Sequence, residues 1–291
     1  ETARRHSGKP ALICDGITLT YDELYARASG FARELADQGF KAGDRIALVL
    51  PNDWTFVVAI LGIWKLGATA VPLNPLLKSA EQVAILADVD PTTVICGFES
   101  RRAVWDTVVD SSAPALIGYS SGSTGRPKGA VFSHASVTFA DRSWADMMAI
   151  TPDDVVLSVL PLPHSFGLHG SLLAPLLRGA QVVLFPGGFS LQAVLAAIEK
   201  HSATLFLGVA TMFRRLLNAP DFSAIDLTSL RLAVSGAAPC PWELAVAWRR
   251  LTGTRILRGY GMTELFRPIS YLAAEDNDRS ESIGRAVPGV Q

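Results

Sequence analysis

Apolar and polar positions follow two patterns along this chain, one typical of helices and one typical of buried strands. Between Leu24 and Leu35 the apolar residues recur at helical spacing. Thr20 and the acidic residues after it predict the N-terminus of this helix, and Gly39 predicts its end. The segment 45–50 is almost entirely apolar over a length typical of a strand. The pattern therefore predicts a helix followed by a buried strand.

The same alternation continues through the rest of the chain to residue 257. Further helices are predicted at 53–66, 81–88, 135–148, 168–177, 191–200, 211–217 and 241–251. Further strands are predicted at 67–72, 93–96, 115–119, 130–133, 155–159, 181–185, 204–207, 230–234 and 255–257. Strands that alternate with helices predict parallel sheets with helices on both faces. The predicted fold class is therefore α/β.

Composition excludes several kinds of protein. The 291 residues are 49% hydrophobic and 18% charged, enough for one large domain or two ordinary ones. A net charge of −1 argues against a general nucleic-acid binder. The three cysteines lack CxxC spacing, which favours buried or free thiols in a reducing compartment. The longest apolar run, 56–66, contains Lys65 and is too short to span a bilayer. We expect a cytoplasmic protein without a transmembrane segment.

The segment 119–129, with the sequence YSSGSTGRPKG, carries the strongest chemical signal. Its glycines let backbone N–H groups turn toward one anion, its hydroxyls add donors, and Lys128 adds a positive charge. A P-loop is disfavoured because the lysine precedes the last glycine and a strand, not a helix, follows. A flexible Gly/Ser loop is the plain alternative. The pattern favours a phosphate-binding loop that joins two strands.

This segment resembles the phosphate-binding motif of the AMP-forming acyl-CoA synthetases, a family related to luciferases and peptide-synthetase adenylation domains. The resemblance implies that the loop binds ATP and that Lys128 has a catalytic role, holding the phosphates that leave as pyrophosphate. The predicted ATP-binding residues here are Ser120, Ser121, Gly122, Ser123, Thr124, Gly125 and Lys128.

Residues 259–264, with the sequence GYGMTE, resemble the second signature of the family. The resemblance implies that Tyr260 stacks on adenine, Thr263 bonds a phosphate oxygen and Glu264 holds Mg²⁺, with Thr263 and Glu264 catalytic. Independently, magnesium among phosphates takes one or two protein carboxylates. A turn before a surface helix is the alternative interpretation. The predicted nucleotide-binding residues of this segment are Gly259, Tyr260, Gly261, Met262 and Thr263.

Two further segments follow predicted strands, where α/β proteins bind ligands. After 230–234 comes a run that by resemblance lies along adenine and ribose, although alone it fits the tight start of a helix. After 155–159 comes His164, assigned by resemblance to the acyl side of the site and predicted catalytic; a structural histidine is the alternative. Phe166, Val209 and Met262 are further candidates for the acyl pocket. The adenine-side residues are Gly236, Ala237, Ala238 and Pro239.

The resemblance implies activation of a carboxylic acid, fatty or aromatic, through an acyl adenylate to an acyl-CoA thioester. ATP, Mg²⁺ and coenzyme A are the implied cofactors and co-substrates, and a homodimer is possible. The alternatives are delivery to a carrier protein and a non-catalytic nucleotide-binding module. We expect residues 1–291 to form the N-terminal AMP-binding domain, with subdomains 1–118 and 119–291, before the β-barrel and C-terminal parts of the family. Such a chain should adenylate poorly alone.

Overall fold

The computed structural model describes residues 1–120, 127–220, 222, 225–276 and 278–290. The chain forms two compact units. The first contains Glu1–Ala140 and Pro161–His164, and the second contains Asp141–Leu160 and Ser165–Gln291. The boundary after Ala140 thus falls within helix α5, His134–Met147. The predicted division into subdomains 1–118 and 119–291 stays a prediction. Within the described residues, no helix is both long and apolar enough to cross a membrane.

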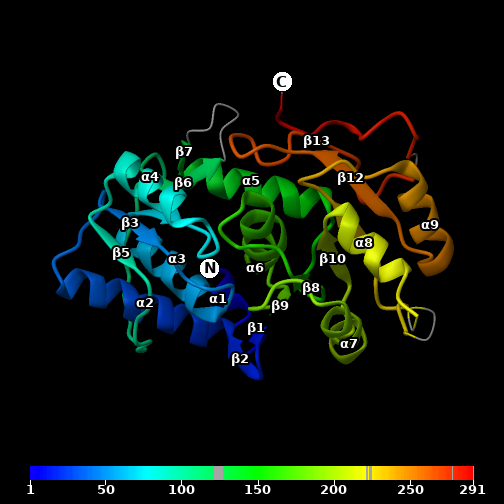
Figure 1. The fold of residues 1–291 in the computed structure, drawn as a ribbon. Helices are drawn as coiled ribbons and strands as arrows, with labels where there is room; N and C mark the ends of the chain where they lie inside the picture. Colours follow the sequence, from blue (N-terminus) through cyan, green and yellow to red (C-terminus); the bar gives the residue numbers. More distant parts are fainter. Residues whose placement is uncertain (121–126, 221, 223–224, 277, 291) are drawn as a thin grey trace. The chain divides into compact units, whose positions relative to one another are not determined.

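The first unit is built on a five-stranded sheet in the order β5-β3-β4-β6-β7 (Figure 1). Its strands run parallel except for β7, which pairs antiparallel with β6. The strands are β3 Arg45–Leu48, β4 Thr69–Pro72, β5 Thr93–Ile95, β6 Pro114–Ser120 and β7 Lys128–Ser133. The other elements are α1 Thr2–Arg5, β1 Pro10–Cys14, β2 Ile17–Thr20, α2 Tyr21–Asp37, α3 Trp54–Leu66 and α4 Ser79–Val89.

Local hydrogen bonds fix the helix ends of this unit where the sequence predicts them. The Thr20 hydroxyl accepts a bond from the backbone N–H of Glu23, and the Glu23 carboxylate accepts one from the backbone of Thr20. This capping box satisfies two donors at the start of α2. The Asp53 carboxylate accepts from Thr55 N at 2.8 Å to cap α3, which ends at Gly67 with φ 81°. These predicted boundaries are confirmed.

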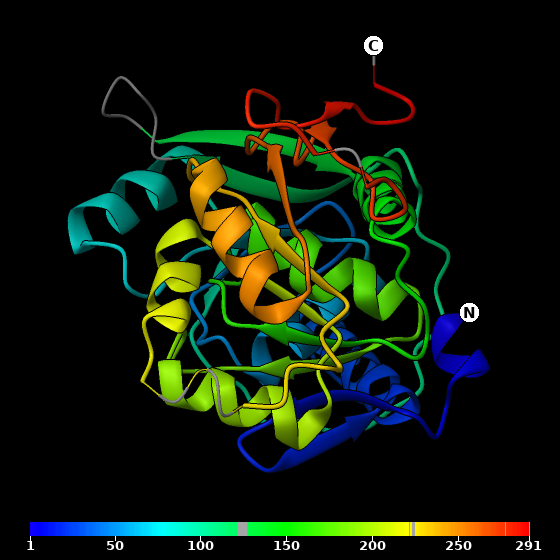
Figure 2. The ribbon, with the colours of Figure 1, turned by 90° about the vertical axis from the view of Figure 1, so that its right-hand side faces the viewer.

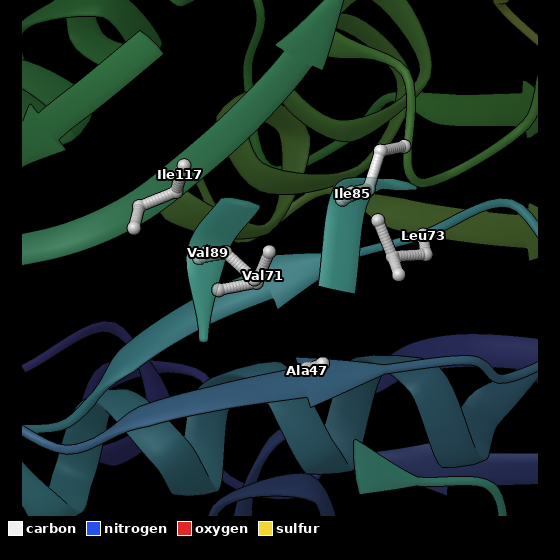
Figure 3. Packing of buried hydrophobic residues seen from close by; sticks show 6 residues of the cluster. All are labelled: Ala47, Val71, Leu73, Ile85, Val89 and Ile117. Carbon is white, nitrogen blue, oxygen red and sulfur yellow. The ribbon is translucent and has the colours of Figure 1, made fainter. Parts of the chain in front are cut away.

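Helices cover both faces of this sheet, as the alternation of elements predicts. Helix α3 contacts β3 and β4 on one side and α2 on the other, and most of its side chains are buried. On the opposite face, Ile85 and Val89 of α4 point from one helical face onto the strands (Figure 3). The residues of this cluster are Ala47, Val71, Leu73, Ile85, Val89 and Ile117.

The sheet of the second unit runs in the order β14-β13-β12-β11-β10-β8-β9. Strands β9, β8, β10, β11 and β12 are mutually parallel, and β13 and β14 are antiparallel. Helices α7, α8 and α9 pack in succession beside this sheet (Figure 2). The strands are β8 Val155–Ser158, β9 Gln181–Leu184, β10 Leu205–Gly208, β11 Leu232–Ser235, β12 Ile256–Tyr260, β13 Ile269–Ser270 and β14 Arg285–Ala286. The helices are α7 Leu191–His201, α8 Ala210–Leu217 and α9 Trp242–Thr252. The predicted α/β class is confirmed.

The helix predicted at 168–177 exists but has a different backbone. It begins as the π-helix η1, Phe166–Leu173, and continues as the short α-helix α6, Ala174–Leu177. All side chains of η1 are buried. Hydrophobic periodicity reveals a helix without distinguishing its hydrogen-bond spacing, so the prediction of an ordinary helix is corrected here. π-Helical turns often lie at functional sites.

Asp154, immediately before β8, joins three segments of the second unit. Its buried carboxylate accepts bonds from Arg231 Nε and Nη2, both at 2.8 Å, and from Thr204 Oγ1 at 2.7 Å. Replacing Asp154 with asparagine should lower the free energy of unfolding by about 2 kcal/mol, because Arg231 loses its charged acceptor. Urea unfolding measures this loss. Asp146→Asn, at an exposed ion pair with Arg178, is the control and should change little.

The same carboxylate makes stability depend on pH. Burial acts to raise the pKa of Asp154, but the bonds from Arg231 and Thr204 outweigh it and lower the pKa. Such a group stabilises the fold above its unfolded pKa of about 3.9, and the stabilisation is lost as the pH falls through the lower folded pKa. Between pH 7 and pH 3 the wild type should therefore lose more stability than Asp154→Asn. Equal losses in both would contradict this role.

Candidate functional site

Two of the predicted segments begin at the same edge of the second sheet. Strands β11 and β12 are parallel neighbours, with Ser235 opposite Arg258. Their carboxyl ends therefore lie together, and the segments 236–239 and 261–264 both begin at this edge. This is the edge where open α/β sheets bind ligands. The structure thus brings together the adenine-side segment and the second signature, which are about twenty residues apart in the sequence.

The loop after β11 begins with a buried glycine and continues with three small exposed residues. Gly236 is buried, and a Cβ there would lie 3.1 Å from Cε1 of Phe166, so the glycine lets this ring approach the main chain. Ala237 adopts φ 61°, in the left-handed region that non-glycine residues rarely occupy. Ala237, Ala238 and Pro239 are exposed. Small exposed residues suit the approach of a flat ring, as the sequence predicts for this segment.

The second signature begins inside β12 instead of after it. Gly259 and Tyr260 pair antiparallel with Ser270 and Ile269 of β13. The prediction that this strand ends at residue 257 is therefore wrong by three residues, because the pairing with β13 extends it. Tyr260 is 45% exposed although it lies in a strand. An aromatic face that is open at a strand end is free to stack on a base.

Residues 261–266 form a tight turn that leads into β13. Met262 N donates to Phe266 O at 3.1 Å, and Phe266 has φ 47°. A Cβ on Gly261 would lie 2.0 Å from that same carbonyl oxygen, so only glycine fits at 261. Thr263 is half-buried and Glu264 is exposed. The turn continues to a strand, which contradicts the alternative of a turn before a surface helix.

Glu264 is accessible for a metal. Its carboxylate makes no ion pair or hydrogen bond with any residue that the structure describes. No group of three or more His, Cys, Asp or Glu side chains suited to a metal was found among the described residues. Magnesium bound to phosphates needs only one or two protein carboxylates, so a lone exposed glutamate fits this kind of site. The role of Glu264 stays a prediction.

A buried polar cluster lies next to the turn, and it contains Arg267, which directly follows the turn in the sequence. Arg267 is 5% exposed, its Nε donates to Ser270 Oγ at 3.2 Å, and its guanidinium lies 4.9 Å from the centroid of the Trp144 ring. Burial lowers the pKa of Arg267 to about 9, so it stays charged at neutral pH. Nearby, His169 Nδ1 and Asp141 Oδ1 are 2.8 Å apart, and burial raises the pKa of Asp141.

Candidate acyl-pocket residues lie in both units. In the second, Phe166 is buried and meets the Trp144 ring edge-on, with centroids 6.3 Å apart. Val209 immediately precedes α8, and both Val209 and Met262 are half-buried. His164 belongs to the first unit and ends a turn in which its backbone N–H donates to Pro161 O at 3.1 Å. His164 is exposed, and partial desolvation lowers the pKa of its imidazole, which favours the neutral form.

The predicted phosphate loop joins the two antiparallel strands of the first unit, as expected. Ser120 of β6 pairs with Lys128 of β7, and the Lys128 residue is exposed. Tyr119 donates to the Asp88 carboxylate at 2.6 Å, which ties the hairpin to α4. A strand follows the loop, unlike the helix that follows a P-loop. Five predicted ATP-binding residues lie outside the described residues: Ser121, Gly122, Ser123, Thr124 and Gly125.

Comparison with known proteins agrees with the motifs. The sequence model of the AMP-binding enzyme family matches residues 1–291. Feruloyl-CoA synthase of Amycolatopsis sp. is 32% identical over 90% of this chain and 58% of that protein. The mitochondrial malonate–CoA ligase of Mus musculus is 32% identical over 94% of this chain and 55% of that protein. The chain therefore spans less than two thirds of the length of these relatives.

A solved structure supports the same fold. The crystal structure of the anthranilate CoA ligase AuaEII in complex with anthranoyl-AMP superposes with a TM-score of 0.90 at 27% identity. The match covers 99% of this chain and 64% of that one. The alignment with the malonate–CoA ligase runs over 321 residues, which is longer than this chain, so that relative carries residues without a counterpart here.

Proposed function

The chain belongs to the AMP-binding enzyme family, and from this premise we propose that it activates a carboxylic acid with ATP, giving an acyl adenylate and then an acyl-CoA thioester. One observation of the structure carries the proposal. The parallel pairing of β11 and β12 brings the start of the loop 236–239 and the end of β12, which carries Tyr260, to one sheet edge, and the turn with Glu264 follows directly after β12. Such an edge offers an aromatic face, an accessible main chain and a carboxylate to a nucleotide.

In the first half-reaction the acid's carboxylate attacks the α-phosphorus of ATP, and pyrophosphate leaves. Both reactants are anions, so the protein must offset their charge where it develops. We assign the β- and γ-phosphates to Lys128 and the loop before it, and an α-phosphate oxygen to the Thr263 hydroxyl. Magnesium, when bound through Glu264, would neutralise phosphate charge. Tyr260 and the loop 236–239 hold the adenine side.

In the second half-reaction a thiol attacks the acyl carbonyl of the mixed anhydride, the new C–S bond forms and AMP leaves. We propose coenzyme A as the thiol, because the named relatives are a feruloyl-CoA synthase and a malonate–CoA ligase. For the acid, Phe166 and Met262 favour an apolar or aromatic group. The cytoplasmic location and the homodimer expected from the sequence stay predictions.

Binding and exchange measurements test this function. Titration calorimetry of the 291-residue chain should detect binding of Mg·ATP. ATP–pyrophosphate exchange, measured on the chain joined to the C-terminal part of a relative, should depend on a carboxylic acid, with aromatic and fatty acids ahead of amino acids. If exchange occurs but the acyl group is transferred only to a carrier protein, the acceptor is that protein's thiol and not coenzyme A. Binding without exchange for any acid would leave a nucleotide-binding module and refute the ligase.

A further inference from the structure

Arg267 carries a buried positive charge without a carboxylate to balance it. Its Nε bonds the neutral Ser270 hydroxyl, and its Nη2 bonds Leu257 O at 3.4 Å. Its Nη1 has no hydrogen-bond partner, and no ion pair to Arg267 is found within the described part of the chain. The nearby Asp141 is engaged with His169. A buried charge is costly when it is neither paired nor fully hydrogen-bonded.

Another arginine of the same unit forms an ion pair with a carboxylate. Arg255, immediately before β12, donates to the Asp278 carboxylate at 2.6 Å, and its side chain is 12% exposed. It lies at the amino end of the strand, four residues before Gly259 and therefore roughly 13 Å from it. Arg267 differs from Arg255 in both respects. It pairs with no carboxylate of the described residues, and it packs against the carboxyl end of β12.

The charge of Arg267 lies directly beneath the second signature. A Cβ on Gly259 would lie 2.3 Å from Nη2 of Arg267, so the glycine permits the guanidinium to pack against the main chain there. On its other side the guanidinium faces the Trp144 ring. Trp144 and Gly259 thus enclose it in a medium of low polarity, where a charge acts over a longer distance than in water. The residues that follow, Tyr260 to Glu264, are those assigned to the nucleotide and its magnesium ion.

We propose that Arg267 is a positioning residue that holds the end of β12 and leaves a positive charge beneath the loop, which favours the phosphate of a bound nucleoside monophosphate over a neutral nucleoside. The inference rests on the proposed nucleotide site. An anion bound at this end of β12 would balance the charge of Arg267, which no carboxylate of the described residues does. It also gives a reason for a cation at a position where a hydrophobic residue of similar volume would cost less to bury.

A comparison of AMP with adenosine separates this role from a purely structural one. In Arg267→Gln the affinity for AMP should fall by about tenfold, whereas the affinity for adenosine should change by less than about twofold. Arg267→Lys keeps the charge and should retain most of the AMP preference. Calorimetry on the 291-residue chain supplies both constants, and thermal unfolding establishes that each variant is folded.

Two further variants serve as controls. Arg255→Gln removes a balanced arginine at the far end of the strand and should leave the ratio of the two affinities unchanged. Ser270→Ala removes a hydrogen-bond partner of Arg267 but keeps its charge, and should also preserve the ratio. Equal weakening of AMP and adenosine by Arg267→Gln would overturn the proposal. A wild-type chain that bound neither ligand would instead refute the nucleotide site and the proposed function.

Discussion

Replacement of Glu264 by glutamine should lower adenylate formation by at least about a hundredfold, the loss typical when a group that stabilises developing charge is removed. The residue is exposed within the tight turn and makes no ion pair among the described residues, so its carboxylate remains available to a metal. Glutamine keeps its size and removes its charge. ATP–pyrophosphate exchange, measured on the chain joined to the C-terminal part of a relative, gives the rate, and calorimetry at several magnesium concentrations measures the coupling between metal and ATP.

A matched control for Glu264 is Glu243, an exposed glutamate of the same unit in the first turn of α9. Glu243→Gln should leave exchange and magnesium coupling at the wild-type level. The variant at 264 should bind ATP with an affinity that no longer responds to magnesium. If Glu264→Gln kept the wild-type exchange rate and the wild-type response to magnesium, another group would hold the metal.

Helix ends were predictable because neighbouring residues determine them. Thr20 and Asp53 cap their helices through bonds to residues two or three positions away, and Gly67 ends α3 in a left-handed conformation. All of these contacts are visible in a short window of sequence. The parallel arrangement was equally predictable from the alternation of strands and helices, and it was enough to bring the loops after β11 and β12 to one edge.

Features that depend on distant residues were not predictable. Gly259 and Tyr260 belong to β12 only because β13 pairs with them from nine or more residues further along. Arg267 stands in the sequence between Phe266 and Pro268, where a charged residue usually indicates surface. Its burial is due to Trp144, more than a hundred positions away. The roles of Ser120, Lys128, His164 and Thr263 stay predictions, since chemical roles follow from ligands and not from backbone geometry.

Substitution of Gly261 by alanine should abolish nucleotide binding, with a loss of affinity of at least about a hundredfold, or roughly 3 kcal/mol. The new Cβ would lie 2.0 Å from Phe266 O, a backbone atom that cannot rotate away. The turn must open, and the bond from Met262 N to that oxygen is lost with it. Because Tyr260 directly precedes the turn and Glu264 lies within it, both would leave their positions. Calorimetry with AMP and with Mg·ATP measures the loss.

Gly187 provides the comparison that separates crowding from the general cost of replacing a glycine. It lies in the same unit, its φ is not positive, and an added Cβ would meet nothing within 4 Å. Gly187→Ala should therefore bind AMP normally and be as stable as wild type or slightly more so, because alanine restricts the unfolded chain. Normal AMP binding by Gly261→Ala would mean that the turn tolerates a side chain, and that the positions of Tyr260 and Glu264 do not depend on its close packing.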